Sequence, residues 1–530
     1  MSKAILNGHE ARLKVKEGVD KGCDAVRPTL GAVGMTALIE FRGLDPIECD
    51  DGVTILKNLD FKDAYENMGI QMLRKAATRT SKEGGDGTAT TTVLTQALVA
   101  EAFKEIANDS SKIREVKERL QTGLAEVIAE LAKIKRDVSG EDIERIARIS
   151  SLDSDVAKII ANIIQEVGIH GVVTVEQGAK LGYTSEVVKG ARFGSGLISP
   201  YFINDKTAGQ TVLEDAYIIL VDRRISTNEQ IIGLLNSIGP GHDILFIADD
   251  IDSVALGTLA QNAVQGIANI ACVRNPFKGS PARDFLFDMA ALTGGTVISE
   301  EMGMKINEAT AVLCGRADKV VVTRENTTII GGRGQEGLET RIKAVQDAIE
   351  GAVSEYTKLQ LEDRLASLTG GIGVIRVGAY TDTEFHAKKY KFENAVNATQ
   401  AALQEGILPG GGSALLSLAE KLHEPMFKRA VQAPFMQMVE NAGLVGSQLL
   451  DEFMMPNKHE DVQTMTRTNY HVERGFGIDF KSKKIVDMFD AGVIDPFKVT
   501  RLALESATAI ASSLVGMETA IITEDEPTTK

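Results

Sequence analysis

Residues 83–94 read EGGDGTATTTVL: an acidic residue held between glycines, then a run of hydroxyl side chains and an apolar stretch. Glycines permit left-handed backbone angles, and the apolar spacing that begins at residue 93 predicts an amphipathic helix. The loop therefore opens onto a helix N-terminus. Free N–H groups there, together with the hydroxyls of Thr88, Thr90 and Thr91, favour an anion.

The acid in this loop indicates which kind of anion. Asp86 would repel a phosphate unless a hard cation lay between them, and Mg²⁺ is usually held by one or two carboxylates together with phosphate oxygens. The stretch therefore predicts a nucleotide site with Asp86 on the metal. The competing interpretation is that Asp86 or Thr88 only caps the helix.

Composition limits the class of protein. The chain has 530 residues, enough for about three domains. Its net charge of −16 argues against nucleic-acid binding and against binding to anionic membranes. The four cysteines form no C-x-x-C pair, no apolar leader begins the chain, and no run reaches the ~18 apolar residues of a membrane span. These features predict a cytosolic protein.

The pattern that predicts secondary structure changes twice along the chain. Residues 1 to about 133 are expected to be mainly helical, with a short hairpin formed by residues 35–41 and 52–60. From about residue 170, short β-rich runs alternate with helical segments, and the chain then ends in helices. This order predicts a helical domain made from both ends of the chain, with an α/β domain inserted and hinges at Gly190 and 370–371. The alternative is a row of consecutive domains.

Further stretches contain glycine-rich or acidic turns that could contribute to a nucleotide site. Gly332, Gly334 and Gly337 form a G-x-G-x-x-G, but the helix after them runs too long and no later strand ends in an acid, which disfavours a dinucleotide fold. TLGAVGMT (29–36) predicts a backbone nest for phosphate, and CDDGVTI (49–55) places two acids on a turn. LPGGGSAL, further along the chain, is a glycine turn that lets a flat base approach the backbone.

Taken in order, these stretches resemble the group I chaperonins of the GroEL type. The resemblance runs across nearly all of the chain, through TLGAVG, DDGVTI, ENMGIQM, GGDGTATTTVL, GVVTVEQG, ISPYFIN, LTGGTVISEEMG, ENAVNATQAALQEGILPGGG and AGVIDPFKVTRLAL. It implies a multidomain α and α/β fold. The implied parts are a helical equatorial ATP-binding domain (1–133 and 405–530), a small intermediate hinge domain (134–189 and 374–404) and an inserted α/β apical domain (190–373).

The resemblance also implies the cofactors and the nucleotide site. ATP and Mg²⁺ are expected, with K⁺ as a further candidate ion and Asp86 as the metal ligand. The implied nucleotide-binding residues are Thr29, Leu30, Gly31, Asp86, Gly87, Thr88, Ala89, Thr90, Ser150, Gly411, Gly477, Val493 and Asp495.

The implied catalytic residues are Asp51 and Asn394, and here the chain departs from the family. Asp50 stands where the family has a lysine, and Ala89 stands where it has a threonine. Asn394 stands where the family has the aspartate that activates the attacking water. An amide can orient water but cannot take its proton.

Non-native polypeptides are the implied clients, and the chain itself is the implied partner in a heptameric ring. The expected client groove consists of Tyr201, Phe202, Ile232, Leu235, Leu256, Ala260 and Gln261. Ala260 and Gln261 replace aliphatic residues, which reduces the apolar area offered. Ring–ring contacts would fall at Met436 and Val445, and the family's Gly-Gly-Met tail is absent. The number of rings and the need for a co-chaperonin lid stay open.

The predicted function is therefore an ATPase that assists protein folding in a ring-shaped chamber. The expected location is the cytoplasm of a bacterial cell, with a phage as a candidate source of the gene. The alternative, motivated by Asn394, is a ring holdase that binds ATP and clients with very slow or no hydrolysis.

Overall fold

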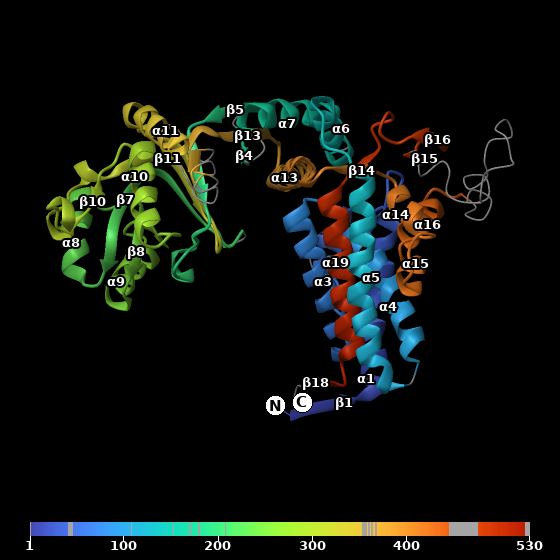
Figure 1. The fold of residues 1–530 in the computed structure, drawn as a ribbon. Helices are drawn as coiled ribbons and strands as arrows, with labels where there is room; N and C mark the ends of the chain where they lie inside the picture. The colour runs from blue at the N-terminus through green and yellow to red at the C-terminus, as the bar shows by residue number, and fades with distance from the viewer. Residues whose placement is uncertain are drawn as a thin grey trace. The chain divides into compact units, whose positions relative to one another are not determined.

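The structure is a computed structural model. It describes residues 2–40, 46–107, 109–151, 153–168, 171–178, 181–206, 208–351, 358, 361, 364–365, 368–444 and 475–524. The chain divides into two compact units: unit 1 comprises Met1–Ala161 and His386–Lys530, and unit 2 comprises Asn162–Phe385. The prediction of a helical part made from both ends of the chain, with an α/β part inserted, is confirmed (Figure 1).

A helical bundle forms the core of unit 1. It consists of α1 (Gly8–Val26), α3 (Ala64–Gly84), α4 (Thr88–Ile106), α5 (Ile113–Ile134) and α19 (Phe497–Gly516). Helix α19 packs against α3, α4 and α5, so residues from opposite ends of the sequence share one apolar core. Leu504 and Leu514 of α19 are fully buried in the same cluster as Leu94 and Leu98 of α4. Of the helices described, none is both long and apolar enough to cross a bilayer.

Shorter elements complete unit 1 at both ends of the bundle. They are β1 (Ser2–Asn7), η1 (Arg27–Thr29), β2 (Ala37–Ile39), β3 (Ile47–Cys49), α2 (Gly52–Lys57), η2 (Ser110–Lys112), α6 (Gly140–Ser151), β14 (Ile407–Pro409), α14 (Ser413–Leu418), α15 (Pro425–Ala430), α16 (Ala433–Asn441), β15 (Phe476–Asp479), β16 (Lys484–Asp487), β17 (Ile494–Pro496) and β18 (Thr519–Glu524). Strand β1 pairs antiparallel with β18, which brings the two ends of the chain side by side (Figure 1). Two helices, α7 (Ser154–Val167) and α13 (Asp382–Glu405), begin in one unit and end in the other.

The predicted hairpin is right in its first strand and wrong in its second. Strand β2 pairs antiparallel with β3, whereas residues 52–57 form helix α2. The carboxylate of Asp51 accepts hydrogen bonds from the backbone N–H groups of Val53 at 3.3 Å and Thr54 at 2.7 Å. This N-cap satisfies the first donors of the helix and outweighs the strand preference of the β-branched residues that follow.

Unit 2 contains two sheets. A seven-stranded mixed sheet has the order β6-β12-β11-β7-β8-β9, with β10 also paired to β7, and a three-stranded sheet has the order β4-β13-β5. The large sheet comprises β6 (Gly190–Phe193), β7 (Thr211–Ile225), β8 (Asp243–Ile251), β9 (Asn269–Arg274), β10 (Val297–Ile298), β11 (Gly315–Val322) and β12 (Thr327–Gly332). The small sheet comprises β4 (Val172–Gln177), β5 (Gly182–Val188) and β13 (Ile372–Gly378).

Helices cover both faces of the large sheet, as expected for strands buried on two sides. They are α8 (Asn228–Ile238), α9 (Ser253–Val264), α10 (Ser280–Thr293) and α11 (Gln335–Glu350). Along β7 the side chains alternate between two cores: Ile218 and Leu220 lie in the cluster with α10, and Ile219 and Val221 lie in the cluster with α8 and α9. This second face carries the helices of the predicted client groove.

The G-x-G-x-x-G motif serves packing in this fold. Strand β12 pairs antiparallel with both β11 and β6, so no parallel βαβ unit surrounds the motif. A Cβ atom at Gly334 would lie 2.0 Å from the carbonyl oxygen of Ala291, and one at Gly332 would lie 2.5 Å from that of Leu292. The glycines let this turn lie against the end of α10, and the dinucleotide interpretation is excluded.

Candidate functional site

The loop between α3 and α4 has the geometry that its glycines predict. Gly85 ends α3 with φ of 80° and Gly87 caps α4 with φ of 86°, both left-handed. The first intrahelical bond of α4 runs from the N–H of Thr91 to the carbonyl oxygen of Gly87 at 2.8 Å. The N–H groups of residues 88–90 precede that bond and have no partner within the helix, so the first turn of α4 offers donors to an anion.

The threonines of this turn have different roles. The side chain of Thr91 is fully buried, and its hydroxyl bonds to the carbonyl oxygen of Gly87 at 2.8 Å and to Thr80 at 3.1 Å. Its predicted role as a hydroxyl donor to phosphate is therefore wrong. Thr88 is buried beneath Gly52, where a Cβ atom would lie 2.8 Å from its methyl group. This close contact brings the turn of Asp51 against the first turn of α4.

Three acids gather at this place. The side chain of Asp86 is open to solvent on one side, yet the surrounding protein desolvates it enough to raise its pKa, and the charge of Asp51 adds to the effect. Asp495 lies on β17, opposite Leu408 of β14. Burial, and then the charge of Asp86, raise the pKa of the Asp495 carboxyl to about 7. Asp86 is thus close enough to both Asp51 and Asp495, which come from two distant segments, for their charges to repel it.

This arrangement fits Mg²⁺ bound together with a nucleotide better than a metal bound by protein alone. In the part of the chain that the structure describes, no group of three or more metal-ligating side chains is placed to hold an ion by itself. Mg²⁺ needs only one or two carboxylates when phosphate oxygens supply the remaining ligands. Asp86 can provide the carboxylate, and the first turn of α4 can receive the phosphates.

The remaining predicted nucleotide residues come from five segments of the chain, at residues 29–31, 150, 411, 477 and 493. Leu30 lies in an apolar cluster with Val93, Met438 and Ile478. Gly31 has φ of 94°, and a Cβ atom there would lie 2.8 Å from Met438, a residue that sequence reasoning missed. The amide of Asn441 fixes this turn through the carbonyl oxygens of Arg27 and Leu30, at 3.0 and 2.9 Å.

The glycine turn after β14 meets β15 and β17. The N–H of Gly410 bonds to the carbonyl oxygen of Val493 at 2.9 Å. Cβ atoms at Gly411 and Gly477 would lie 3.2 and 2.6 Å from the side chain of Met488, a second residue that the sequence did not single out.

Thr29 and Ser150 are positioned by their elements. The hydroxyl of Thr29 bonds to the carbonyl oxygen of Val26 at 2.8 Å. Ser150 lies on α6, one turn beyond Ile146, which packs beside Ile494 of β17. The structure thus brings residues 29–31, 86–90, 411, 477 and 493–495 to neighbouring turns of unit 1, with Ser150 on a helix that packs on one of them.

The two predicted catalytic residues are linked through a tyrosine. The hydroxyl of Tyr390 on α13 donates to Oδ1 of Asp51 at 3.1 Å, and the side chain of Asn394 is hydrogen-bonded to the same tyrosine. Tyr390 gave no signal in the sequence, because its partner Asp51 lies 339 residues away.

The residues predicted for the client groove lie close together in unit 2, and all but one reach its surface in part or fully. Tyr201 is 69% exposed and Ile232 is also exposed, while Leu235, Leu256 and Ala260 are partly buried between α8 and α9. Phe202 was expected on the surface but is 2% exposed, because it packs into the core beneath these helices.

Helix α9 carries more of this surface than the sequence suggested. Gln261 is exposed on α9, on the same face as Val254 and Val264, two exposed apolar residues that sequence reasoning missed. The hydroxyl of Thr258 on α9 bonds to Asn228 on α8 at 3.0 Å and holds the two helices together.

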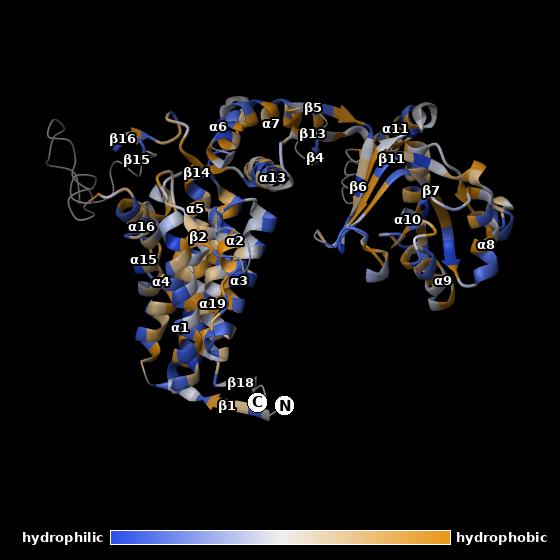
Figure 2. Ribbon diagram, turned by 180° about the vertical axis from the view of Figure 1, so that it is seen from behind, coloured by the Kyte–Doolittle hydropathy of each residue, from blue (hydrophilic) through white to orange (hydrophobic). Residues whose placement is uncertain are grey.

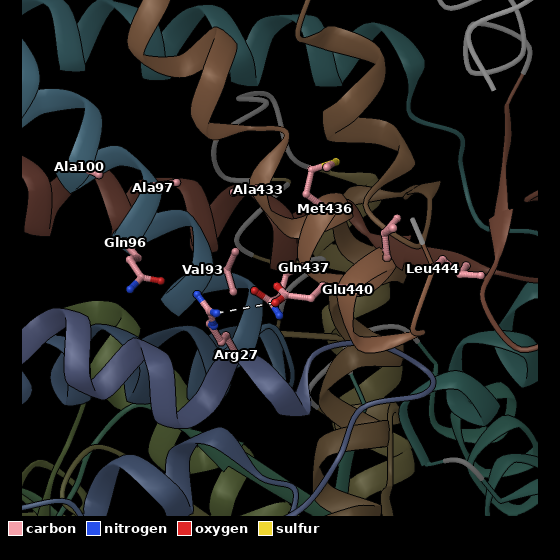
Figure 3. A pocket seen from close by; sticks show the side chains of 11 residues that line it. Arg27, Val93, Gln96, Ala97, Ala100, Ala433, Met436, Gln437, Glu440 and Leu444 are labelled. Carbon is pink, nitrogen blue, oxygen red and sulfur yellow. Dashed lines mark ion pairs between the residues drawn. The ribbon is translucent and has the colours of Figure 1, made fainter. Parts of the chain in front are cut away.

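Of the two residues expected at ring–ring contacts, the structure describes only Met436. Met436 lines a recess of about 570 Å³ between α4 and α16, with Arg27 and Glu440 at 3.9 Å from each other at its edge (Figure 3). Val445 lies outside the described residues.

Comparisons with known proteins agree with this geometry. The sequence model of the TCP-1/cpn60 chaperonin family matches residues 23–525. Two crystal forms of the chaperonin gp146 from bacteriophage EL 2 (Pseudomonas aeruginosa), both in the presence of ATP-BeFx, are similar in structure, with TM-scores of 0.69 and 0.62. In each case the identity is 20%, and the match covers 98% of this chain and 99% of gp146. The chain therefore belongs to the TCP-1/cpn60 chaperonin family.

Proposed function

We propose that the protein is an ATP-driven chaperonin that captures non-native polypeptides on unit 2 and hydrolyses ATP in unit 1. The observation that carries the proposal is the meeting of Asp51, Asp86 and Asp495 at the first turn of α4. Asp86 feels the negative charge of both Asp51 and Asp495, and such a group of acids beside free N–H donors is stabilised when a cation and a polyanion bind together. Within the family, MgATP is the ligand that supplies both, and K⁺ is a further candidate ion.

The chain's own residues provide the rest of the site. Bound Mg²⁺ would neutralise phosphate charge, with Asp86 as its protein ligand. The first turn of α4 orients the phosphates through backbone N–H groups, and the base and ribose would lie beside the turns at Gly31, Gly411 and Gly477. Asp51 takes the proton of the attacking water as the new bond to phosphorus forms and the bond to the ADP oxygen breaks.

A second candidate function follows from Asn394. If the family's aspartate at that position is the main base, its replacement by an amide leaves a ring that binds ATP and clients but hydrolyses very slowly. General-base assistance is worth about 10²–10⁴-fold in rate. The two functions therefore differ by a measurable amount of phosphate release.

The test is steady-state phosphate release by the purified protein and two variants. Asp51→Asn keeps the cap on α2, because an amide oxygen also accepts from the N–H of Thr54, but it removes the base. If Asp51 is the base, Asp51→Asn lowers turnover by about 10²–10⁴-fold and Asn394→Asp does not accelerate it. If turnover is negligible in the wild type and rises in Asn394→Asp, the holdase alternative is correct. Asp86→Ala should abolish Mg²⁺-dependent nucleotide binding in either case.

Client capture is assigned to the surface of α8 and α9. Tyr201, Ile232, Val254 and Val264 are exposed on it, and such residues bind apolar segments of unfolded chains in a helix-in-groove or extended mode. The groove lies apart in sequence from the nucleotide residues, so variants can separate capture from ATP binding.

Assembly into a homo-oligomeric ring, with seven subunits proposed, is supported by open strand edges. Among the described residues β1 and β18 pair only with each other, and β2 and β3 pair only with each other. Leu38 of this hairpin is 77% exposed, and Ile5 and Ile521 are exposed on the terminal strands. Two-stranded sheets are marginal alone, and open edges accept further strands. A second copy of the chain would complete them.

The finer organisation remains part of the proposal. Equatorial (1–133 and 405–530), intermediate (134–189 and 374–404) and apical (190–373) domains are proposed, with hinges at their borders. Limited proteolysis with and without ATP tests these borders, because cleavage should concentrate near residues 134, 190 and 374. We propose the bacterial cytoplasm as the location and leave the co-chaperonin lid open.

A further inference from the structure

Helix α13 carries a tyrosine that reaches the catalytic turn of unit 1. The Tyr390 hydroxyl donates to Oδ1 of Asp51 at 3.1 Å and is also hydrogen-bonded by the side chains of Ser81 and Asn394. These partners come from the cap of α2, the last part of α3 and α13 itself. Tyr390 and Asn394 are four residues apart and share one face of α13.

The direction of each hydrogen bond can be assigned. Burial, and then the charge of Asp51, raise the pKa of Tyr390 to about 12, so the phenol keeps its proton and donates it to the carboxylate. Hydrogen bonds with the side chains of Ser81 and Asn394 lower the pKa of Tyr390, as bonds donated to the phenol oxygen do, so we assign both side chains as donors. The donor of Asn394 is its amide nitrogen, so its amide oxygen stays available as an acceptor.

The same bonds decide which oxygen of Asp51 can act on water. Oδ1 accepts from the hydroxyl of Tyr390 and from the N–H of Val53 at 3.3 Å. Oδ2 accepts from the N–H of Thr54 at 2.7 Å. A carboxylate oxygen has about two acceptor positions, so Oδ1 is occupied and Oδ2 keeps one position for a further proton.

We propose that Tyr390 is a positioning residue for ATP hydrolysis: its hydroxyl fixes Asp51 with Oδ2 free toward the attacking water and fixes the amide of Asn394 with its oxygen as a second acceptor for that water. The inference rests on the proposed ATPase function and adds a residue to it. It also accounts for an asparagine at position 394, because an aspartate there could not donate to the phenol and would compete with Asp51 for its single proton.

The test variant is Tyr390→Phe, which keeps the buried ring and removes only the hydroxyl. Loss of a hydrogen bond to a charged group corresponds to roughly a 10- to 100-fold change, so kcat for phosphate release should fall by that factor. The dissociation constant of the nucleotide should stay unchanged, since the hydroxyl acts on Asp51 and Asn394. Tyr380→Phe is the matched control, because Tyr380 is 81% exposed and lies in unit 2; its kcat should equal that of the wild type.

A double-mutant cycle separates positioning from general destabilisation. In an Asp51→Asn background, Tyr390→Phe should lower the residual rate by less than it lowers the wild-type rate, because the carboxylate through which the hydroxyl mainly acts is already absent. Helicity measured by circular dichroism should be the same in all variants.

Each outcome decides a different question. Wild-type protein that binds ATP but releases no phosphate refutes the proposed ATPase, and the positioning role falls with it. Wild-type turnover with an unchanged kcat in Tyr390→Phe refutes the positioning role alone. An equal loss of nucleotide affinity and kcat, or additive effects in the cycle, shows a structural role for the hydroxyl and also overturns the inference.

Discussion

Replacing Gly85 by alanine should destabilise the protein and displace the loop that carries Asp86. Gly85 has φ of 80°, and a Cβ atom there would lie 2.4 Å from both the backbone nitrogen of Ala398 and Cβ of Asn397. Both contacts are on α13, two turns beyond Tyr390. The loop that carries Asp86 is therefore held directly against the helix that carries Tyr390 and Asn394.

The cost of Gly85→Ala has two parts. An L-residue in the left-handed region costs roughly 1–2 kcal/mol. Relief of an overpacked contact costs typically about 1–3 kcal/mol, and here one partner is a backbone atom that cannot turn away. The sum is a loss of about 2–5 kcal/mol in the free energy of unfolding, together with a displaced Asp86 and weaker binding of MgATP.

Gly443→Ala is the matched control, since Gly443 has φ of 64° and nothing within 4 Å of the added Cβ atom. It should lose only the backbone part. Unfolding in urea followed by circular dichroism at 222 nm is a suitable assay, because unit 1 is helical and the chain contains no tryptophan for fluorescence. If Gly85→Ala is no less stable than Gly443→Ala and binds MgATP as tightly as the wild type, the packing of this loop on α13 is not what holds the site.

Three further predictions concern clients, pH and assembly. Tyr201→Glu should abolish suppression of aggregation of an unfolded protein, because it places an unpaired charge against apolar client surface, while ATP binding persists; undiminished capture would locate the client surface elsewhere. The carboxyl of Asp495 has a pKa raised to about 7, so folding penalises its charged form and stability is lost as pH rises from about 4 to 7. Asp495→Asn should therefore raise the melting temperature of the nucleotide-free protein at pH 7.5 by more than at pH 5, and a pH-independent difference would contradict this. The expected ring–ring positions, Met436 and Val445, are apolar, so we expect native mass measurements to show a heptamer whose double-ring form is weak or depends on ATP; a fourteen-subunit particle that persists on dilution in both states would refute it.

Local chemistry explains which parts of this fold could be predicted. The loop at Asp86 was predictable because two glycines and a following apolar period act within a dozen residues. Most strands of unit 2 were predictable because they contain a short β-branched run, although β6 (Gly190–Phe193) contains none. The inserted α/β part followed from the order of helical and β-rich segments along the chain. The segment after Asp51 was predicted as a strand because of Val53, Thr54 and Ile55, yet one side-chain cap made it a helix. The hydrogen bonds from Val53 and Thr54 to the Asp51 side chain, two and three residues away, thus outweighed the strand propensity of the six residues of α2.

The site itself depends on contacts that sequence spacing cannot reveal. Met438 and Met488 lie against glycines of the nucleotide turns, but in the sequence each is one apolar residue among many. Comparison of the sequence with the family indicated only that Asn394 replaces the aspartate expected to act as the base. The structure gives Asn394 a second interpretation. We assign its amide as a donor to the hydroxyl of Tyr390, and that hydroxyl donates its one proton to the carboxylate of Asp51. An aspartate at position 394 would place a second negative charge beside Asp51 and leave that proton contested. In the mechanism that we propose, Asn394 and Tyr390 therefore form a matched pair that keeps Asp51 as the single base of the site.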